Sequence, residues 1–82
     1  MSNINATAIF TEKDQDFRNE TTTYWFVVQS EDARIESGEY GICDNNGEIF
    51  PVYDDGAPID CNEFERSAIL SVCQITEEMI QA

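Results

Sequence analysis

The chain has 82 residues, 41% of them hydrophobic, and its 17 Asp and Glu against four Lys and Arg give a formal charge of −13. This length suits one domain, residues 1–82, built around one core, and the apolar content excludes a chain that is disordered by composition. The charge excludes binding to nucleic acid or to an anionic membrane through electrostatic attraction. It favours a basic protein as the partner.

Cysteine usage and hydropathy give an expected location. Cys43, Cys61 and Cys73 are an odd number of cysteines without C-x-x-C spacing, so we interpret them as reduced thiols in the core of a cytoplasmic protein. The sequence shows no signal-peptide pattern and no long apolar run, so we expect neither secretion nor membrane insertion.

The first half of the chain predicts two strands. Ala6–Glu12 alternates in character and is expected to be a strand, and Lys13–Glu20 is polar and is expected to be a loop with Phe17 exposed. Thr21–Ser30 is the strongest strand signal because it is rich in β-branched and aromatic residues on both faces. A strand that is apolar on both faces is usually central in its sheet.

A second pair of strands is predicted around an Asn-Gly turn. Glu31–Arg34 is expected to be a turn, and Ile35–Cys43 a strand. A three-residue hairpin loop, Asn45–Gly47, is preferred because it pairs Ile42 with Phe50 and Tyr40 with Val52 and so gathers apolar side chains on one face. A two-residue loop would instead pair Ile42 with Pro51 and Asp44 with Ile49.

The last strand and the helix complete the predicted fold. Glu48–Tyr53 contains Pro51 and is therefore expected either at a sheet edge or with a local bulge, and a turn follows over Asp54–Pro58. One helix is predicted over Cys61–Gln81, with Asp60 or Asn62 as the alternative N-caps. Its apolar stripe is Cys61, Phe64, Ala68, Val72, Ile75 and Met79, widened by Ile69, Cys73 and Ile80.

These elements define an α+β fold, a four-stranded antiparallel meander with one C-terminal helix packed on one face. One helix covers only one face of a sheet, so Trp25 or Tyr24 is expected to lie partly open.

Catalysis and metal binding are not indicated. The chain has no histidine, no Cys-His pair, no P-loop and no G-x-S-x-G motif. Asp44, Asn46 and Glu48 have the spacing of an EF-hand loop, but Ile49 replaces its glycine and Asp55 its glutamate. We therefore expect no enzyme activity, no catalytic residue, no cofactor and no specific metal site.

The acidic residues are the candidate binding site. They concentrate in predicted loops, and few cations interrupt them, whereas ordinary surfaces mix both signs. Asp14, Asp16, Asp44 and Glu48 are expected at one end of the sheet, and Glu31, Asp32, Asp54 and Asp55 at the other. Because affinity concentrates in a few aromatic anchors, Phe17, Tyr53 and Trp25 are candidate anchors. The predicted partner-binding residues are Asp14, Asp16, Phe17, Glu31, Asp32, Glu36, Glu39, Asp44, Glu48, Tyr53, Asp54 and Asp55.

In size and charge the chain resembles small acidic phage-encoded inhibitors, the anti-CRISPR and DNA-mimic class. The resemblance covers composition over the whole chain and rests on no motif. It implies a protein that blocks the basic nucleic-acid-binding surface of an enzyme or effector complex in the cytoplasm of a host cell. The alternatives are a small structural or assembly module, including a homodimer, and a protein whose acidity serves solubility or a high-salt habitat.

Overall fold

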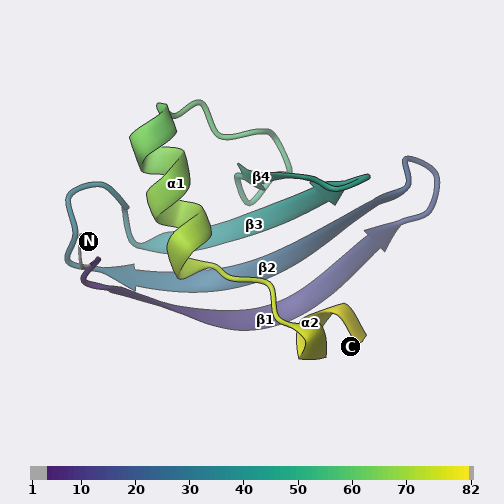
Figure 1. Cartoon of the computed structure of the whole chain (residues 1–82), viewed down its shortest axis with the longest axis horizontal. Coiled ribbons are helices and arrows are strands. Elements are labelled where there is room, and N and C mark those ends of the chain that lie inside the picture. The colour runs from purple at the N-terminus through teal and green to yellow at the C-terminus, as the bar shows by residue number, and fades with distance from the viewer. Residues whose placement is uncertain (1–3, 82) are drawn as a thin grey trace.

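The computed structural model describes residues 4–81, which form a four-stranded antiparallel sheet and two helices (Figure 1). The strands follow one another across the sheet in the order β1-β2-β3-β4, which confirms the α+β meander and places β2 inside the sheet and β4 at an edge. The elements are β1 (Ala6–Asp16), β2 (Thr21–Ser30), β3 (Gly38–Asn45), β4 (Glu48–Val52), α1 (Glu63–Val72) and α2 (Glu77–Gln81).

The first strand is longer than its sequence indicates. The prediction of a loop over Lys13–Glu20 is wrong, because β1 continues to Asp16, which pairs with Thr21. The polar second half of β1 is held in extended form by the β-branched start of β2, so its partner strand overrides its own weak strand propensity. Only the short turn at 17–20 remains, and Glu20 has a positive φ of 56° there.

The third strand begins later than predicted. It starts at Gly38, and Ile35 belongs to the connection between β2 and β3. That connection is folded back by hydrogen bonds from Ile35 N to Asp32 O (3.1 Å) and from Ser30 N to Ser37 Oγ (2.9 Å). The Ile35 side chain is buried in the core. Its apolar character is therefore explained by burial of a loop residue and does not indicate a strand.

The hairpin between β3 and β4 has a two-residue turn, so the predicted three-residue loop and its pairing are wrong. Asn46 and Gly47 both have positive φ, at 53° and 92°, as the tightest hairpin turns require. Asp44 Oδ1 accepts a hydrogen bond from Gly47 N (2.9 Å). The observed pairs are Ile42 with Pro51, Cys43 with Phe50, Asp44 with Ile49 and Gly41 with Val52. Backbone geometry at the turn therefore sets the register, and β4 buries side chains on both faces.

The predicted single helix is two helices. Asn62 is the N-cap of α1: its side chain accepts from Glu65 N (2.8 Å) and completes a capping box. The helix ends at Val72, and its C-cap Cys73 has a ψ of 65°, which is not helical. Thr76 Oγ1 then accepts from Met79 N (3.4 Å) at the start of α2. This local capping by a threonine competes with continuation of the helix.

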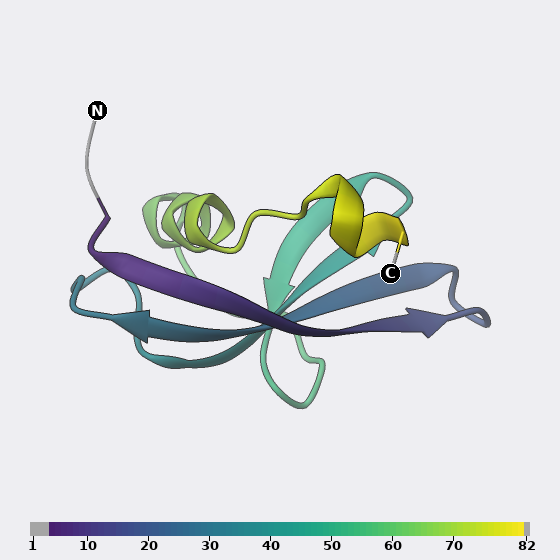
Figure 2. The same cartoon turned by 90° about the horizontal axis from the view of Figure 1, so that it is seen from below.

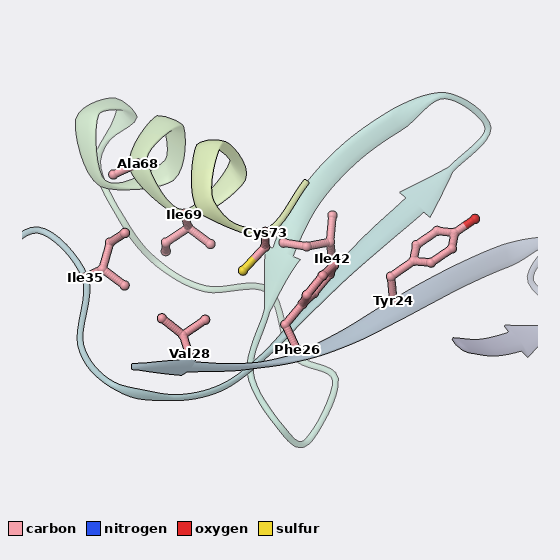
Figure 3. Close-up of a cluster of buried hydrophobic side chains, with 8 residues drawn as sticks. All are labelled: Tyr24, Phe26, Val28, Ile35, Ile42, Ala68, Ile69 and Cys73. Carbon is pink, nitrogen blue, oxygen red and sulfur yellow. The ribbon is translucent and has the colours of Figure 1, made fainter. Parts of the chain in front are cut away.

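Both helices lie on one side of the sheet (Figure 2). The core lies between α1 and the sheet, where Val28, Phe26 and Ile42 lie below the helix, while Tyr24 lies farther along β2 on the same side of the sheet (Figure 3). Phe64, which the apolar stripe assigns to the core, is instead 83% exposed, because the contacting face of α1 centres on Ala68 and Ile69. The buried cluster consists of Tyr24, Phe26, Val28, Ile35, Ile42, Ala68, Ile69 and Cys73.

Burial of Cys73 predicts a loss of stability in alkali. Desolvation raises the pKa of its thiol from 9.0 to about 12, so the folded state retains a proton that the unfolded chain loses. The contribution of the protonated thiol to the free energy of unfolding is complete below pH 9 and declines as the pH rises toward 12. The pKa values of Tyr24 and Tyr40 are also raised by desolvation. The free energy of unfolding in urea should fall with rising pH in this range, and less steeply for Cys73→Ala; a pH-independent value would contradict the assignment.

Candidate functional site

The helix-free side of the sheet is here called the outer face, and the turn that follows β4 lies on this side (Figure 2). Its members follow from strand register, since alternate side chains point to opposite faces. They are Thr7, Ile9, Glu12, Asp14 and Asp16 of β1, Thr21, Thr23, Trp25, Val27 and Gln29 of β2, Glu39, Gly41, Cys43 and Asn45 of β3, and Glu48, Phe50 and Val52 of β4.

A β-bulge in β1 determines which charges reach this face. Phe10 pairs with Phe26 and Glu12 with Trp25, which leaves Thr11 as the extra residue. The Thr11 hydroxyl donates a hydrogen bond to Trp25 O (3.2 Å). The extra residue reverses the alternation, so the three carboxylates that follow point outward and Lys13 points to the helix side. In a regular strand, Lys13 would point to the outer face, and the carboxylates of Glu12, Asp14 and Asp16 would point to the side that the helices cover.

The carboxylates of the outer face form a row along β1 and extend across the sheet. Glu12, Asp14 and Asp16 are exposed and are spaced by two residues, about 7 Å at each step. Glu48 lies in the same cross-strand row as Asp16 through Thr21 and Asn45. Glu39 lies opposite Val27. The outer face therefore carries five acidic side chains.

None of the chain's four cationic side chains belongs to the outer face. Lys13 donates a hydrogen bond to the carbonyl of Ile80 in α2, on the helix side. Arg66 of α1 donates to Ile49 O (2.8 Å). Arg34 pairs with Asp32 in the β2–β3 connection, and Arg18 lies in the β1–β2 turn. The negative potential of the outer face is thus not neutralised from within it.

Trp25 is fixed at the centre of this face by a glycine. A Cβ at Gly41 would lie 2.7 Å from Val52 Cγ2 and 2.8 Å from both Thr23 Cγ2 and Trp25 Cζ3, so the indole packs directly over the glycine backbone. Trp25 is half-buried and Glu12 lies directly across from it. The result is a positioned aromatic side chain beside carboxylates, an arrangement suited to cationic side chains.

Gly41→Ala should destabilise the protein by about 1–3 kcal/mol, because an overpacked site forces its neighbours to move. The indole is the neighbour that can move outward, so its fluorescence emission should shift to the red. Urea unfolding followed by tryptophan fluorescence measures both effects. Gly47→Ala, at a turn position with a φ of 92° and open space around it, should destabilise without that spectral shift.

The structure brings together the acidic residues predicted for one end of the sheet. Asp14, Asp16, Asp44 and Glu48 all lie at the end formed by the β1–β2 turn and the β3–β4 hairpin (Figure 1), although Asp44 is on the helix side. Phe17, at the tip of the β1–β2 turn, is 82% exposed.

Asp16 has a second, local role at this end. Its carboxylate accepts hydrogen bonds from Asn19 Nδ2 (2.8 Å), Arg18 N (3.1 Å) and Asn19 N (3.3 Å), and the bonds from Asn19 chiefly lower its pKa. Asp16 therefore stays charged and also holds the turn that presents Phe17.

The predicted group at the opposite end is divided. Asp32 forms an ion pair with Arg34 (2.6 Å), and hydrogen bonds from Arg34 chiefly hold its pKa well below the usual range. Glu31 accepts from Asn5 Nδ2 (2.9 Å), whereas the Glu36 side chain is exposed. Asp32 is thus neutralised by its neighbour, and Glu31 and Glu36 are the open charges of this connection.

The turn after β4 does not join that end. Val52, the last residue of β4, lies in the same cross-strand row as Trp25. Trp25 precedes Glu31 by six residues, so about 20 Å of extended chain separates the turn after β4 from the acidic residues of the β2–β3 connection. The turn lies on the side of the sheet away from the helices (Figures 2 and 3). It presents Tyr53, Asp54 and Asp55, all exposed, and Asp55 Oδ1 accepts from Ala57 N (2.9 Å). These residues therefore border the outer face.

Sequence reasoning missed Glu12 as a member of the site. The predicted strand Ala6–Glu12 alternates regularly, and this alternation places Glu12 with Phe10 on the face that the helices cover. The i, i+2 spacing of Glu12, Asp14 and Asp16 was a signal for one shared face. The bulge that turns this face outward has no comparable signature in the sequence.

Comparisons of the chain with protein-family models, with curated proteins and with solved structures found no match. Within residues 4–81, no three Cys, Asp or Glu side chains are grouped so that they could hold a metal ion. Neither helix of this part of the chain is long and apolar enough to cross a membrane.

Proposed function

We propose that this chain is an acidic binding protein that occupies the basic nucleic-acid-binding surface of a partner and thereby excludes nucleic acid, as a DNA-mimic or anti-CRISPR-type inhibitor in the cytoplasm of a host cell. The observation that carries the proposal is the outer face, with five carboxylates and none of the chain's cations. A basic groove matches that face in charge.

The scale of the face supports this proposal. Along β1 the carboxylates recur about every 7 Å, which matches two base-pair steps measured along the axis of a DNA duplex, at about 3.4 Å per step. Across the sheet, Asp16 and Glu48 are three strand spacings apart, about 14 Å. Charge of this kind gives rapid, oriented association, while affinity concentrates in aromatic anchors. Trp25 and Phe17 are the aromatic side chains placed to act as anchors.

Competition with nucleic acid tests this function. The chain would be titrated into complexes of a labelled duplex with a panel of basic nucleases and CRISPR effector complexes, at several salt concentrations. We expect release of the duplex from at least one member, weakening steeply as salt rises. Displacement that is indifferent to salt, or no displacement across the panel, would refute electrostatic mimicry.

A second candidate function, an assembly module, is favoured by one observation. Ile9 and Val27 are adjacent on the outer face, and they are 68% and 40% exposed. An exposed apolar pair on a sheet face is a contact for another protein surface, and in this case the acidity would serve solubility. Size-exclusion chromatography at two protein concentrations distinguishes the two functions, since a homodimer that survives high salt is expected only of the assembly module.

A further inference from the structure

The two edges of the sheet differ in how their backbone groups are satisfied. On β4, Ile49 O accepts from Arg66 Nη2 (2.8 Å) and Pro51 O accepts from Ile59 N (3.1 Å), and directly after β4 Tyr53 N donates to Ala57 O (2.8 Å). Pro51 has no N–H to leave unpaired. The segment after β4 thus folds back along β4 and closes this edge.

The second half of β1 is protected by other means. The bulge at Thr11 interrupts regular pairing, and Lys13 points to the helix side, where it bonds to α2. Bulges and inward-pointing lysines are devices that block the addition of another strand to a sheet edge. Charged residues dominate this half.

The first half of β1 has none of these devices. Ala6–Phe10 carries no charge, no proline and no bulge. Glu31 N donates to Asn5 O (2.9 Å), which makes Asn5–Glu31 a hydrogen-bonded pair. Because such pairs alternate along antiparallel strands, Ala6, Ala8 and Phe10 direct their N–H and C=O groups away from β2. No backbone group of residues 4–81 hydrogen-bonds to them from that side.

We propose that Ala6–Phe10 is a docking edge at which an extended segment of the basic partner adds as a fifth strand. This inference rests on the proposed function and specifies how the partner is held. The occupant is a segment that alternates apolar residues with Arg or Lys. Its apolar residues would extend the half-buried face of Ala8 and Phe10, and its basic residues would lie on the outer face.

Charge complementarity selects a basic segment over a second copy of this chain. An added strand would run between Glu12 at one end and Glu31 at the other. Near Glu31 the surface has a polar hollow of about 430 Å³, lined by Thr7, Gln29 and Ser37 among others, which has room for a long basic side chain. A second copy would bring another −13 to the same edge. Strand addition gives affinity through backbone hydrogen bonds and specificity through alternate side chains.

The test uses a peptide that alternates arginine and valine, with a glutamate–valine peptide of equal length as the control. Amide hydrogen exchange of the full chain should show new protection at Ala8 and Phe10 with the arginine peptide only, while Thr7 and Ile9, already bonded to β2, change little. Ala8→Pro removes an outward N–H that the fold does not use and should weaken binding by roughly tenfold. Ala8→Val, the matched variant, keeps this N–H and should bind the arginine peptide more tightly than Ala8→Pro does, and thermal melts would verify that both variants fold.

Three results would overturn the docking edge. The first is equal binding of the arginine peptide to Ala8→Pro and Ala8→Val. The second is a change in Trp25 fluorescence on addition of the arginine peptide without new amide protection at Ala8, which would place the peptide on the outer face. The third is protection of Ala8 and Phe10 that rises with protein concentration in the absence of peptide, which would assign the edge to a second copy. Failure of the proposed function is a separate result, because it is read from the release of duplex.

Discussion

Phe26→Ala should lower the free energy of unfolding by about 3–5 kcal/mol, a loss typical of a fully buried phenylalanine. Phe26 is 2% exposed, and its ring meets that of Phe10 edge-on with centroids 5.8 Å apart. Total stabilities are about 5–15 kcal/mol for ordinary domains, so this one change would remove a large part of the whole. Urea unfolding followed by circular dichroism measures the loss.

Phe64→Ala is the matched control for this prediction. It makes the same chemical change on α1, where the side chain is 83% exposed, so the expected change is within about 0.5 kcal/mol. The apolar stripe of the sequence assigns Phe64 to the core, and on that assignment the two variants would lose comparable stability. Equal losses would therefore contradict the structure.

Charge reversal on the outer face should have the largest effect on binding. The double variant Glu12→Lys, Asp14→Lys places two cations beside Trp25, against a basic partner. Its affinity for whichever nuclease or effector the competition assay identifies should fall by about 100-fold, since like charges at an interface cost several kcal/mol. The dependence of binding on salt should become weaker as well. Titration calorimetry at two salt concentrations measures both quantities.

The control is Glu77→Lys, Glu78→Lys in α2, which changes the net charge equally on exposed positions of the helix side. If total charge alone attracts the partner, the two double variants should lose affinity equally. If the outer face is the contact, the α2 variant should lose less than about threefold, consistent with long-range attraction alone.

The sequence predicted the elements whose signals are local. Thr21–Ser30 was recovered with its bounds, because β-branched and aromatic side chains define a strand without reference to its partners. Asn62 was one of two expected caps, and its reciprocal bonds with Glu65 involve neighbouring residues only. The edge position of β4 followed from Pro51. In each case the deciding residues lie within a few positions of the feature.

The features that the sequence did not predict depend on distant contacts or on small local differences in energy. The second half of β1 is a strand because β2 lies beside it. Ile35 is buried because its connection folds back toward α1. The hairpin register was decided by two positive φ angles at Asn46 and Gly47, whereas apolar pairing favoured a different register. The break after α1 accompanies local capping by Thr76, which the continuous apolar stripe of the sequence does not indicate. Consequently most of the candidate acidic residues were identified, but the face that displays them was not.

The extra residue in β1 also has a genetic consequence. Removal of one codon between those for Ile9 and Glu12 would keep the reading frame and nearly the same composition. It would nevertheless exchange the two sides of the strand beyond that point, turning Lys13 outward and the three carboxylates toward the helices. Among variants of this chain, the length of this short segment should therefore track the charge of the surface more closely than the count of acidic residues does.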